Sequence, residues 1–210
     1  MSASLHKLRA HLKGEDDMAD KALLIVDMQK DFCPGGALAV KDCSGIIKNI
    51  NSYIEKFKEK NLPIFASRDW HPAESSHFEK FGGKWPEHCI QNTEGAQFHP
   101  DLKLPEGTII VSKGVFEGED GYSAFDGRDD KSRLLDAILK NTDVKKLYIC
   151  GVATDYCVKS SAIDAAGDYE VYLLEDAIEG VNINAGDAEK SMDEMETHGI
   201  KKVNLDNIEI

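Results

Sequence analysis

The chain has 210 residues, of which 41% are hydrophobic and 30% are charged, and its formal net charge is -13. A chain of this length and apolar content can bury a full hydrophobic core and is most simply one domain. The strong negative charge repels phosphate groups, which excludes nucleic acid and an anionic membrane as main partners and leaves a small molecule as the expected ligand.

The first twenty residues differ in character from the rest of the chain. They are mostly polar, with leucines at helical spacing followed by an acidic run at residues 15–17. We expect residues 1–20 to be a flexible N-terminal extension and residues 21–210 to form the folded domain. No apolar run approaches the roughly 18 residues that a membrane-spanning helix needs, so we expect no membrane partner.

Apolar runs that suit strands alternate with segments of helical periodicity along residues 21–210. Strands are predicted at residues 21–27, 62–67, 108–112, 147–150, 169–174 and 201–205, and helices at residues 43–60, 134–139 with Ser132 as the cap, and 154–167 with Thr154 as the cap. Residues 68–106 form a long irregular stretch. The alternation indicates an α/β, doubly wound domain in which helices cover both faces of an about six-stranded, mostly parallel sheet in three layers.

Functional side chains follow four of the predicted strands at their carboxyl ends. Asp27, Asp69 and Lys113 each come directly after an apolar run, and Cys157 follows the fourth strand across a small-residue corner. In open parallel sheets ligands bind beyond the carboxyl ends of the strands. We therefore expect these side chains to meet at one edge of the sheet.

Cys157 is predicted to lie in the first turn of a helix, where unpaired N–H groups and the helix dipole lower a thiol pKa. Asp27 could accept the thiol proton, and the Lys113 ammonium could stabilise both anions, which together suit a covalent thiol hydrolase. The alternative is a packed, unreactive cysteine, the commoner fate of a lone buried thiol. The five cysteines are scattered without a C-x-x-C pair. This pattern favours free thiols in a reducing compartment, so we expect a cytoplasmic protein.

A second cluster consists of Asp69, His71, His77 and His88. Asp69 and His71 are two residues apart, so an extended chain directs both side chains to one side, and the loop can bring the other two histidines to them. Three imidazoles and one carboxylate without a thiolate suit zinc, iron or manganese. The alternative is a polar loop in which the histidines are incidental.

Four motifs carry a resemblance to a known family. They are VDMQKDF at residues 26–32 with the glycines 35 and 36, RDWHP at residues 68–72 with His77 and WPEHC at 85–89, Lys113-Gly114 with YSAF at 122–125, and GVATDYCV at residues 151–158. With these motifs the chain from about residue 22 onward resembles the isochorismatase-like cysteine hydrolases, and within that family the nicotinamidases.

The resemblance implies a role for each of the singled-out side chains. It implies a catalytic triad of Asp27, Lys113 and Cys157, and an oxyanion hole formed by the N–H groups of Ala153 and Cys157, with a cis peptide before Ala153. It implies one divalent metal ion, expected to be zinc with iron and manganese as alternatives, with the ligands Asp69, His71, His77 and His88. The walls of the substrate pocket are implied to be Phe32, Trp85 and Tyr122.

The implied reaction is hydrolysis of nicotinamide to nicotinate and ammonia through a cysteine thioester, a step of NAD salvage, with pyrazinamide as a further substrate. Two alternatives stay open. One is an amidase of the same fold that acts on a ureidoacrylate or carbamoyl compound, and the other is a metal-binding or redox-thiol module without hydrolase activity. The sequence leaves the formation of a homo-oligomer open.

Overall fold

Six parallel strands form one sheet in a computed structural model that describes residues 20–210. The strands are β1 (Lys21–Val26), β2 (Ile64–Asp69), β3 (Ile109–Lys113), β4 (Lys146–Val152), β5 (Glu170–Glu179) and β6 (Lys201–Val203). Their order in the sheet is β3-β2-β1-β4-β5-β6, and every neighbouring pair is parallel. The predicted doubly wound sheet is confirmed. The flexible extension expected at residues 1–20 lies outside the described residues, apart from Asp20.

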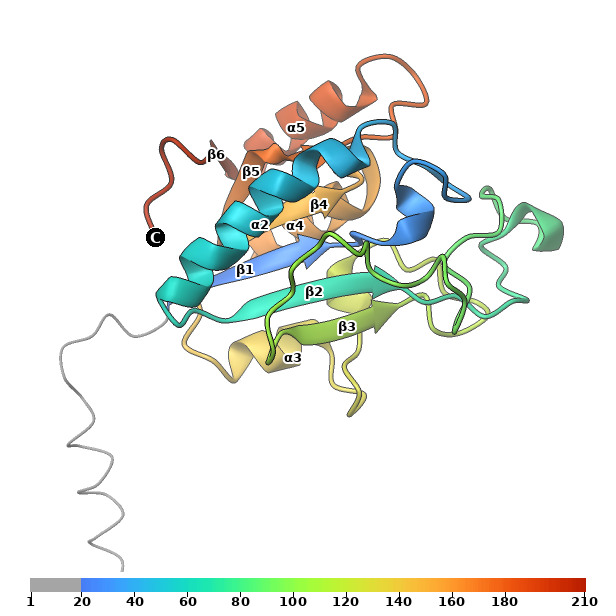
Figure 1. Ribbon diagram of the computed structural model, residues 1–210, viewed down its shortest axis with the longest axis horizontal. Coiled ribbons are helices and arrows are strands. Elements are labelled where there is room, and N and C mark those ends of the chain that lie inside the picture. Colours follow the sequence, from blue (N-terminus) through green and yellow to red (C-terminus); the bar gives the residue numbers. More distant parts are fainter. Residues whose placement is uncertain (1–19) are drawn as a thin grey trace, which may run out of the picture.

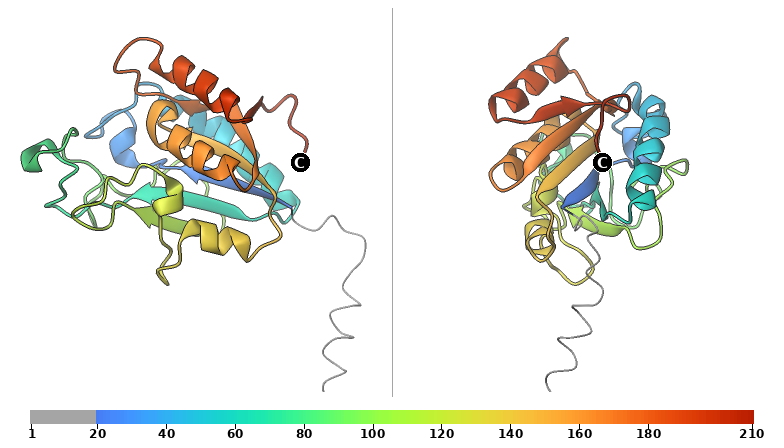
Figure 2. Two further views of the ribbon diagram at one scale, coloured as in Figure 1. Left: turned by 180° about the vertical axis from the view of Figure 1, so that it is seen from behind. Right: turned by 90° about the vertical axis from the view of Figure 1, so that its left-hand side faces the viewer.

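Four α-helices cover the two faces of the sheet. They are α2 (Cys43–Glu59), α3 (Leu135–Lys140), α4 (Lys159–Ala166) and α5 (Asp187–Thr197). In edge view, α2 lies on one face and the other three lie on the opposite face, so the three predicted layers are present (Figure 2). Within the described part of the chain, no helix combines the length and the apolar character needed to cross a bilayer.

The side chains of β1 show why the strand reads as an unbroken apolar run. Leu23 and Ile25 pack on the α2 side, whereas Ala22, Leu24 and Val26 pack against α3, α4 and α5. Successive side chains of a strand point to opposite faces, so a strand covered on both faces needs apolar residues at every position.

The structure corrects two predicted helix starts and contains one helix, α5, that the sequence did not predict. Leu134, not Ser132, precedes α3, and Ser132 instead has a positive φ of 61°. The turn after β4 starts at Thr154 itself, with Ala153 in the capping position and no side-chain cap. Helix α5 had no sequence-based prediction because its buried residues are only Ser191 and Met195, which make a weak apolar stripe.

The strand order reverses between β1 and β4, which lie side by side at the centre of the sheet. All six strands point the same way, so the loops at their carboxyl ends gather at one edge, where the long stretch between β2 and β3 also lies (Figure 1). This switch point is the place where open α/β sheets bind ligands.

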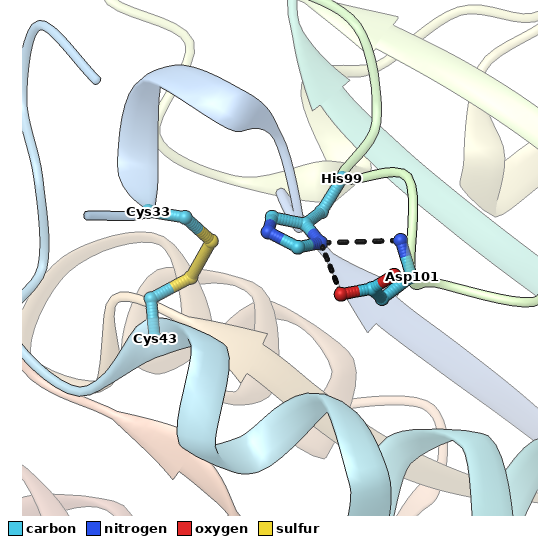
Figure 3. The surroundings of a disulfide bond; sticks show 4 residues. All are labelled: Cys33, Cys43, His99 and Asp101. Carbon is cyan, nitrogen blue, oxygen red and sulfur yellow. Dashed lines mark hydrogen bonds and ion pairs between the residues drawn. A yellow bond between two sulfur atoms is a disulfide. The ribbon is translucent and has the colours of Figure 1, made fainter. Parts of the chain in front are cut away.

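Cys33 and Cys43 form a disulfide bond, which corrects the expectation that all five cysteines are free thiols. The bond joins the turn after β1 to the first residue of α2, and His99 and Asp101 lie beside it (Figure 3). The pairing depends on how the helix start is placed against the turn, which spacing along the chain does not show. Cys89, Cys150 and Cys157 are free and buried.

Candidate active site

The carboxyl edge of the sheet brings together the four side chains that follow its strands. Asp69 and Lys113 end β2 and β3 as register partners, Asp27 follows β1, and Cys157 lies in the turn after β4. None of the four is more than 8% exposed. Burial of ionisable groups is costly unless they pair with one another, and such groups cluster at functional sites.

Lys113 is the centre of this buried group. Its Nζ lies 2.8 Å from Asp27 Oδ2 and 3.4 Å from Cys157 Sγ, donates to the Gly121 carbonyl at 2.6 Å, and also contacts Asp69 Oδ1. Burial by itself would lower the pKa of Lys113, but the two carboxylates raise that pKa well above its ordinary value. The Lys113 ammonium therefore stays charged, and it contacts both other members of the predicted triad, Asp27 and Cys157.

The two carboxylates differ in their protonation behaviour. Burial raises the pKa of Asp27 from 3.8 to about 6, against the opposing attraction of Lys113. Burial acts the same way on Asp69, but the charge of Lys113, together with the neighbouring His71 and His88, holds its pKa well below the ordinary value. Asp27 therefore can exchange a proton near neutral pH, whereas Asp69 remains an anion.

The thiol of Cys157 differs from the sequence-based expectation. Burial raises its pKa well above the ordinary value of 9.0, and the nearby Asp27 and Asp69 raise it further, while Lys113 lowers it. The expected lowering of the thiol pKa is therefore wrong, because burial and the two carboxylates outweigh the lowering of the pKa by Lys113. The resting group is a thiol, which needs a base such as Asp27 to become a nucleophile.

The turn that carries Cys157 is a π-helical turn, Thr154–Val158, preceded by a cis peptide between Val152 and Ala153. The N–H groups of Tyr156 and Val158 both donate to the Ala153 carbonyl at 3.0 Å. Just before it, Gly151 has a φ of +112°, and a Cβ at this position would lie 2.0 Å from the Val26 carbonyl oxygen. Only glycine allows β4 to approach β1 this closely before the chain turns.

The three predicted histidine ligands lie together, and two of them face Asp69. One ring nitrogen from each of His71, His77 and His88 lies within 4.8 Å of the others. Nε2 of His71 and Nε2 of His88 lie 3.6 Å and 3.7 Å from Asp69 Oδ2. Both ring nitrogens of His71 are buried without a hydrogen-bond partner. Buried imidazole nitrogens without partners are uncommon, and together with the neighbouring carboxylate they fit a divalent metal ion.

An apolar pocket opens onto the thiol and onto the histidine cluster. The predicted wall residues Phe32, Trp85 and Tyr122 line it together with Ala153 and Cys157. The Trp85 indole N–H donates to the Tyr122 hydroxyl at 3.0 Å, which holds two of the aromatic walls together. A flat aromatic ring carrying a small polar group suits such a pocket.

Several residues of the pocket were missed by the sequence analysis. Leu38, Tyr156 and Val181 also line it, and the Tyr156 ring packs edge-on against Trp85 with centroids 4.9 Å apart. The position of Tyr156 next to Cys157 could have indicated its role. Val181 follows β5, and its position depends on Asp155, whose carboxylate accepts the Val181 N–H at 2.9 Å.

Two buried side chains that the sequence analysis also missed hold the carboxylates in place. Ser67 donates its hydroxyl to Asp27 Oδ1 at 2.7 Å. The Gln29 side chain accepts the Asp69 N–H and donates to the Asp69 carbonyl, both at 2.8 Å. Gln29 is part of the first motif, and its place in that motif was the signal in the sequence for a role at the site.

The parallel sheet, with a buried thiol, a lysine and two carboxylates gathered at its switch point, is the arrangement expected of an α/β hydrolase with a cysteine nucleophile. The Isochorismatase domain family matches residues 21–204, nearly the whole described part of the chain. The chain therefore belongs to the isochorismatase family.

Relatives with assigned activities are similar over most of their length. A nicotinamidase of Escherichia coli is 38% identical over 200 residues, which cover 87% of this chain and 93% of the relative. A nicotinamidase/pyrazinamidase of Mycobacterium tuberculosis is 33% identical and covers 87% and 98%. Among solved structures, a pyrazinamidase of Pyrococcus horikoshii in complex with zinc has a TM-score of 0.82 and 48% identity, with 89% of this chain and 99% of that chain covered.

Proposed function

We propose that this protein hydrolyses nicotinamide to nicotinate and ammonia, and that it also hydrolyses pyrazinamide. The observation that carries the proposal is the Asp69 carboxylate, one oxygen of which contacts Lys113 while the other faces His71 and His88. A nucleophilic thiol and a metal-binding cluster thus share one aromatic-walled pocket, an arrangement suited to an aromatic carboxamide with a ring nitrogen. The similarity to the nicotinamidases supports the same reaction, which would serve NAD salvage.

In the proposed mechanism Asp27 accepts the Sγ proton of Cys157 as the sulfur attacks the carboxamide carbon. The N–H groups of Ala153 and Cys157 would hold the oxygen as it becomes negative. Asp27 then returns the proton to the leaving nitrogen, so the C–N bond breaks and ammonia departs from a thioester. Asp27 next deprotonates a water molecule, which attacks the thioester, and nicotinate and the thiol are released. Lys113 stays charged beside Asp27 and keeps its carboxylate in place.

Asp69, His71, His77 and His88 would hold one divalent metal ion, with zinc as the first choice. When bound, such an ion supplies a Lewis-acidic position that can accept a ring nitrogen. The aromatic walls Phe32, Trp85 and Tyr122 would hold the ring plane and exclude water from the thioester. A cytoplasmic location is part of this proposal, because Cys157 acts only as a free thiol; the Cys33–Cys43 disulfide lies outside the pocket and takes no part in the reaction.

The experiment that tests the function is ammonia release from nicotinamide. Purified protein should release stoichiometric ammonia and nicotinate from nicotinamide and pyrazinamide, and none from a ureidoacrylate or a carbamoyl amine. Release from the carbamoyl compounds but not from nicotinamide would replace this proposal with the other amidase class.

The pH profile should report the ionisation of Asp27. Its pKa of about 6 means that the carboxylate accepts protons above that pH and is itself protonated below it. We therefore expect kcat/KM for nicotinamide to fall about tenfold per pH unit below about pH 6, and to show no such limb from Lys113, which stays charged. Measurement of kcat/KM between about pH 5 and about pH 8 tests this. A profile without any acid limb would contradict the role of Asp27 as base.

Metal removal should affect ring recognition more than bond breaking. After chelation we expect kcat/KM for nicotinamide to fall by up to about 10⁴-fold, since a site built to pair one polar atom loses that pairing. Benzamide has a C–H group in place of the ring nitrogen, so its already slow hydrolysis should change little. Parallel assays of both amides before and after chelation, with zinc added back, measure the difference. An equal loss for both substrates would show that the cluster serves something other than ring recognition.

A further inference from the structure

One loop connects the buried lysine to the histidine cluster. It follows β3 and contains Gly114, Asp120 and Gly121. Gly114 lies so close to His71 that a Cβ at position 114 would approach the His71 ring to 2.4 Å. The Gly121 carbonyl accepts a hydrogen bond from the Lys113 ammonium. The same loop is fastened to the His77 segment, because the Ser76 N–H donates to the Glu117 carbonyl at 2.8 Å. Side chains of this loop are therefore placed to act on the cluster.

Within the described residues, Asp120 makes the one side-chain hydrogen bond from this loop to a histidine of the cluster. Its Oδ1 lies 3.2 Å from His77 Nδ1, with the His77 side chain 5% exposed and the Asp120 side chain 71% exposed. A carboxylate only accepts hydrogen bonds at neutral pH, so the contact requires a proton on Nδ1. The lone pair of His77 is then on Nε2.

His88 has the same arrangement with a different acceptor. Its Nδ1 lies 2.8 Å from the Pro86 carbonyl oxygen, which likewise places the proton on Nδ1 and leaves Nε2, 3.7 Å from Asp69, with the lone pair. Metal-bound histidines are held in this way by a carboxylate or carbonyl on the second nitrogen, which sets the tautomer and ring orientation. For His88 the acceptor is backbone and survives any side-chain change. For His77 the acceptor is a side chain that mutagenesis can remove.

We propose that Asp120 is a positioning residue for metal binding, acting through His77. It holds the His77 ring in the Nδ1–H tautomer and keeps Nε2 available to the metal. The stacking of His77 on His71, with ring centroids 4.7 Å apart and planes at 15°, restrains the ring plane but does not select which nitrogen carries the proton. The inference rests on the proposed metal site and adds a residue that none of the four motifs contains.

The test is the affinity of the metal-free protein for zinc, measured by competition with a chromophoric chelator. Asp120→Ala should weaken zinc binding about 10- to 100-fold, the usual effect of removing such an acceptor. Asp120→Asn keeps an acceptor oxygen without the charge and should recover most of the affinity. Glu117→Ala removes a carboxylate three positions away in the same loop and should bind zinc like the parent. Because the Asp120 side chain is 71% exposed, the unfolding temperature of the metal-free variants should not differ from the parent.

A ¹⁵N NMR spectrum of the histidine rings gives a second readout, since the Nδ1–H tautomer of His77 should be lost in Asp120→Ala. Unchanged zinc affinity in Asp120→Ala would overturn the inference. Equal losses in Asp120→Ala and Asp120→Asn would also overturn it, because charge and not the acceptor would then be responsible. A parent protein that binds no zinc would overturn the proposed metal site as well, whereas normal zinc binding without hydrolysis of nicotinamide would count against the proposed function alone.

Discussion

Cys157→Ala should abolish hydrolysis of nicotinamide, with kcat reduced by about 10⁴-fold or more, as expected when a covalent nucleophile is removed. The reason is that no other thiol or hydroxyl in the triad can form the acyl intermediate. The fold should remain, because the change removes only one sulfur atom, and that atom belongs to a residue that lines the pocket and is 8% exposed. Circular dichroism and thermal unfolding of the variant, alongside steady-state assays, separate the two effects.

Cys150→Ala is the matched control for this experiment. Cys150 is also a free and fully buried thiol, and burial raises its pKa above the ordinary value. It lies in β4 within the hydrophobic core and does not line the pocket. Its loss should lower stability modestly and leave kcat/KM near the parent value. A Cys157→Ala protein that turned over nicotinamide at nearly the parent rate would rule out the covalent mechanism.

Asp27→Asn should lower kcat by about 10²- to 10⁴-fold, the range associated with loss of a general base. The amide keeps the shape of the side chain and can still meet the Ser67 hydroxyl, but it can neither accept the Cys157 proton nor deliver it to the leaving nitrogen. The acid limb near pH 6 should disappear in the same variant. Asp176→Asn is a suitable control, because that carboxylate accepts from Tyr53 and Leu205 away from the pocket and should affect stability only.

The double variant Asp27→Asn with Cys157→Ala tests whether the two residues act as one unit. Residues of a shared mechanism give strongly non-additive losses. The double variant should therefore be scarcely slower than Cys157→Ala alone. Losses that multiply fully would indicate that Asp27 acts independently of the thiol.

The sequence predicted the framework of the site because the relevant signals are local. The apolar runs before Asp27, Asp69 and Lys113 required strands covered on both faces, and the parallel α/β topology places all such strand ends at one edge. The four motifs then indicated which side chains share the pocket. In the structure Lys113 contacts both Asp27 and Cys157.

Local signals failed where distant parts of the chain decide the outcome. The position of Cys157 at a helix start favours a lowered thiol pKa, but burial and two carboxylates from other strands raise it. Similarly, the spacing of Cys33 and Cys43 gave no sign of a bond, which forms because the start of α2 lies against the turn after β1.

The sequence by itself therefore determined the fold class, the order of the strands along the chain and the residue types that meet at the sheet edge. Only the tertiary structure decided their protonation and their partners: Asp69 shared between Lys113 and the histidines, and Asp120 against His77. The physical reason is that hydrophobic periodicity acts over a few residues, whereas desolvation and charge pairing depend on groups such as Asp69 and Lys113 that are 44 positions apart and meet only in the folded chain.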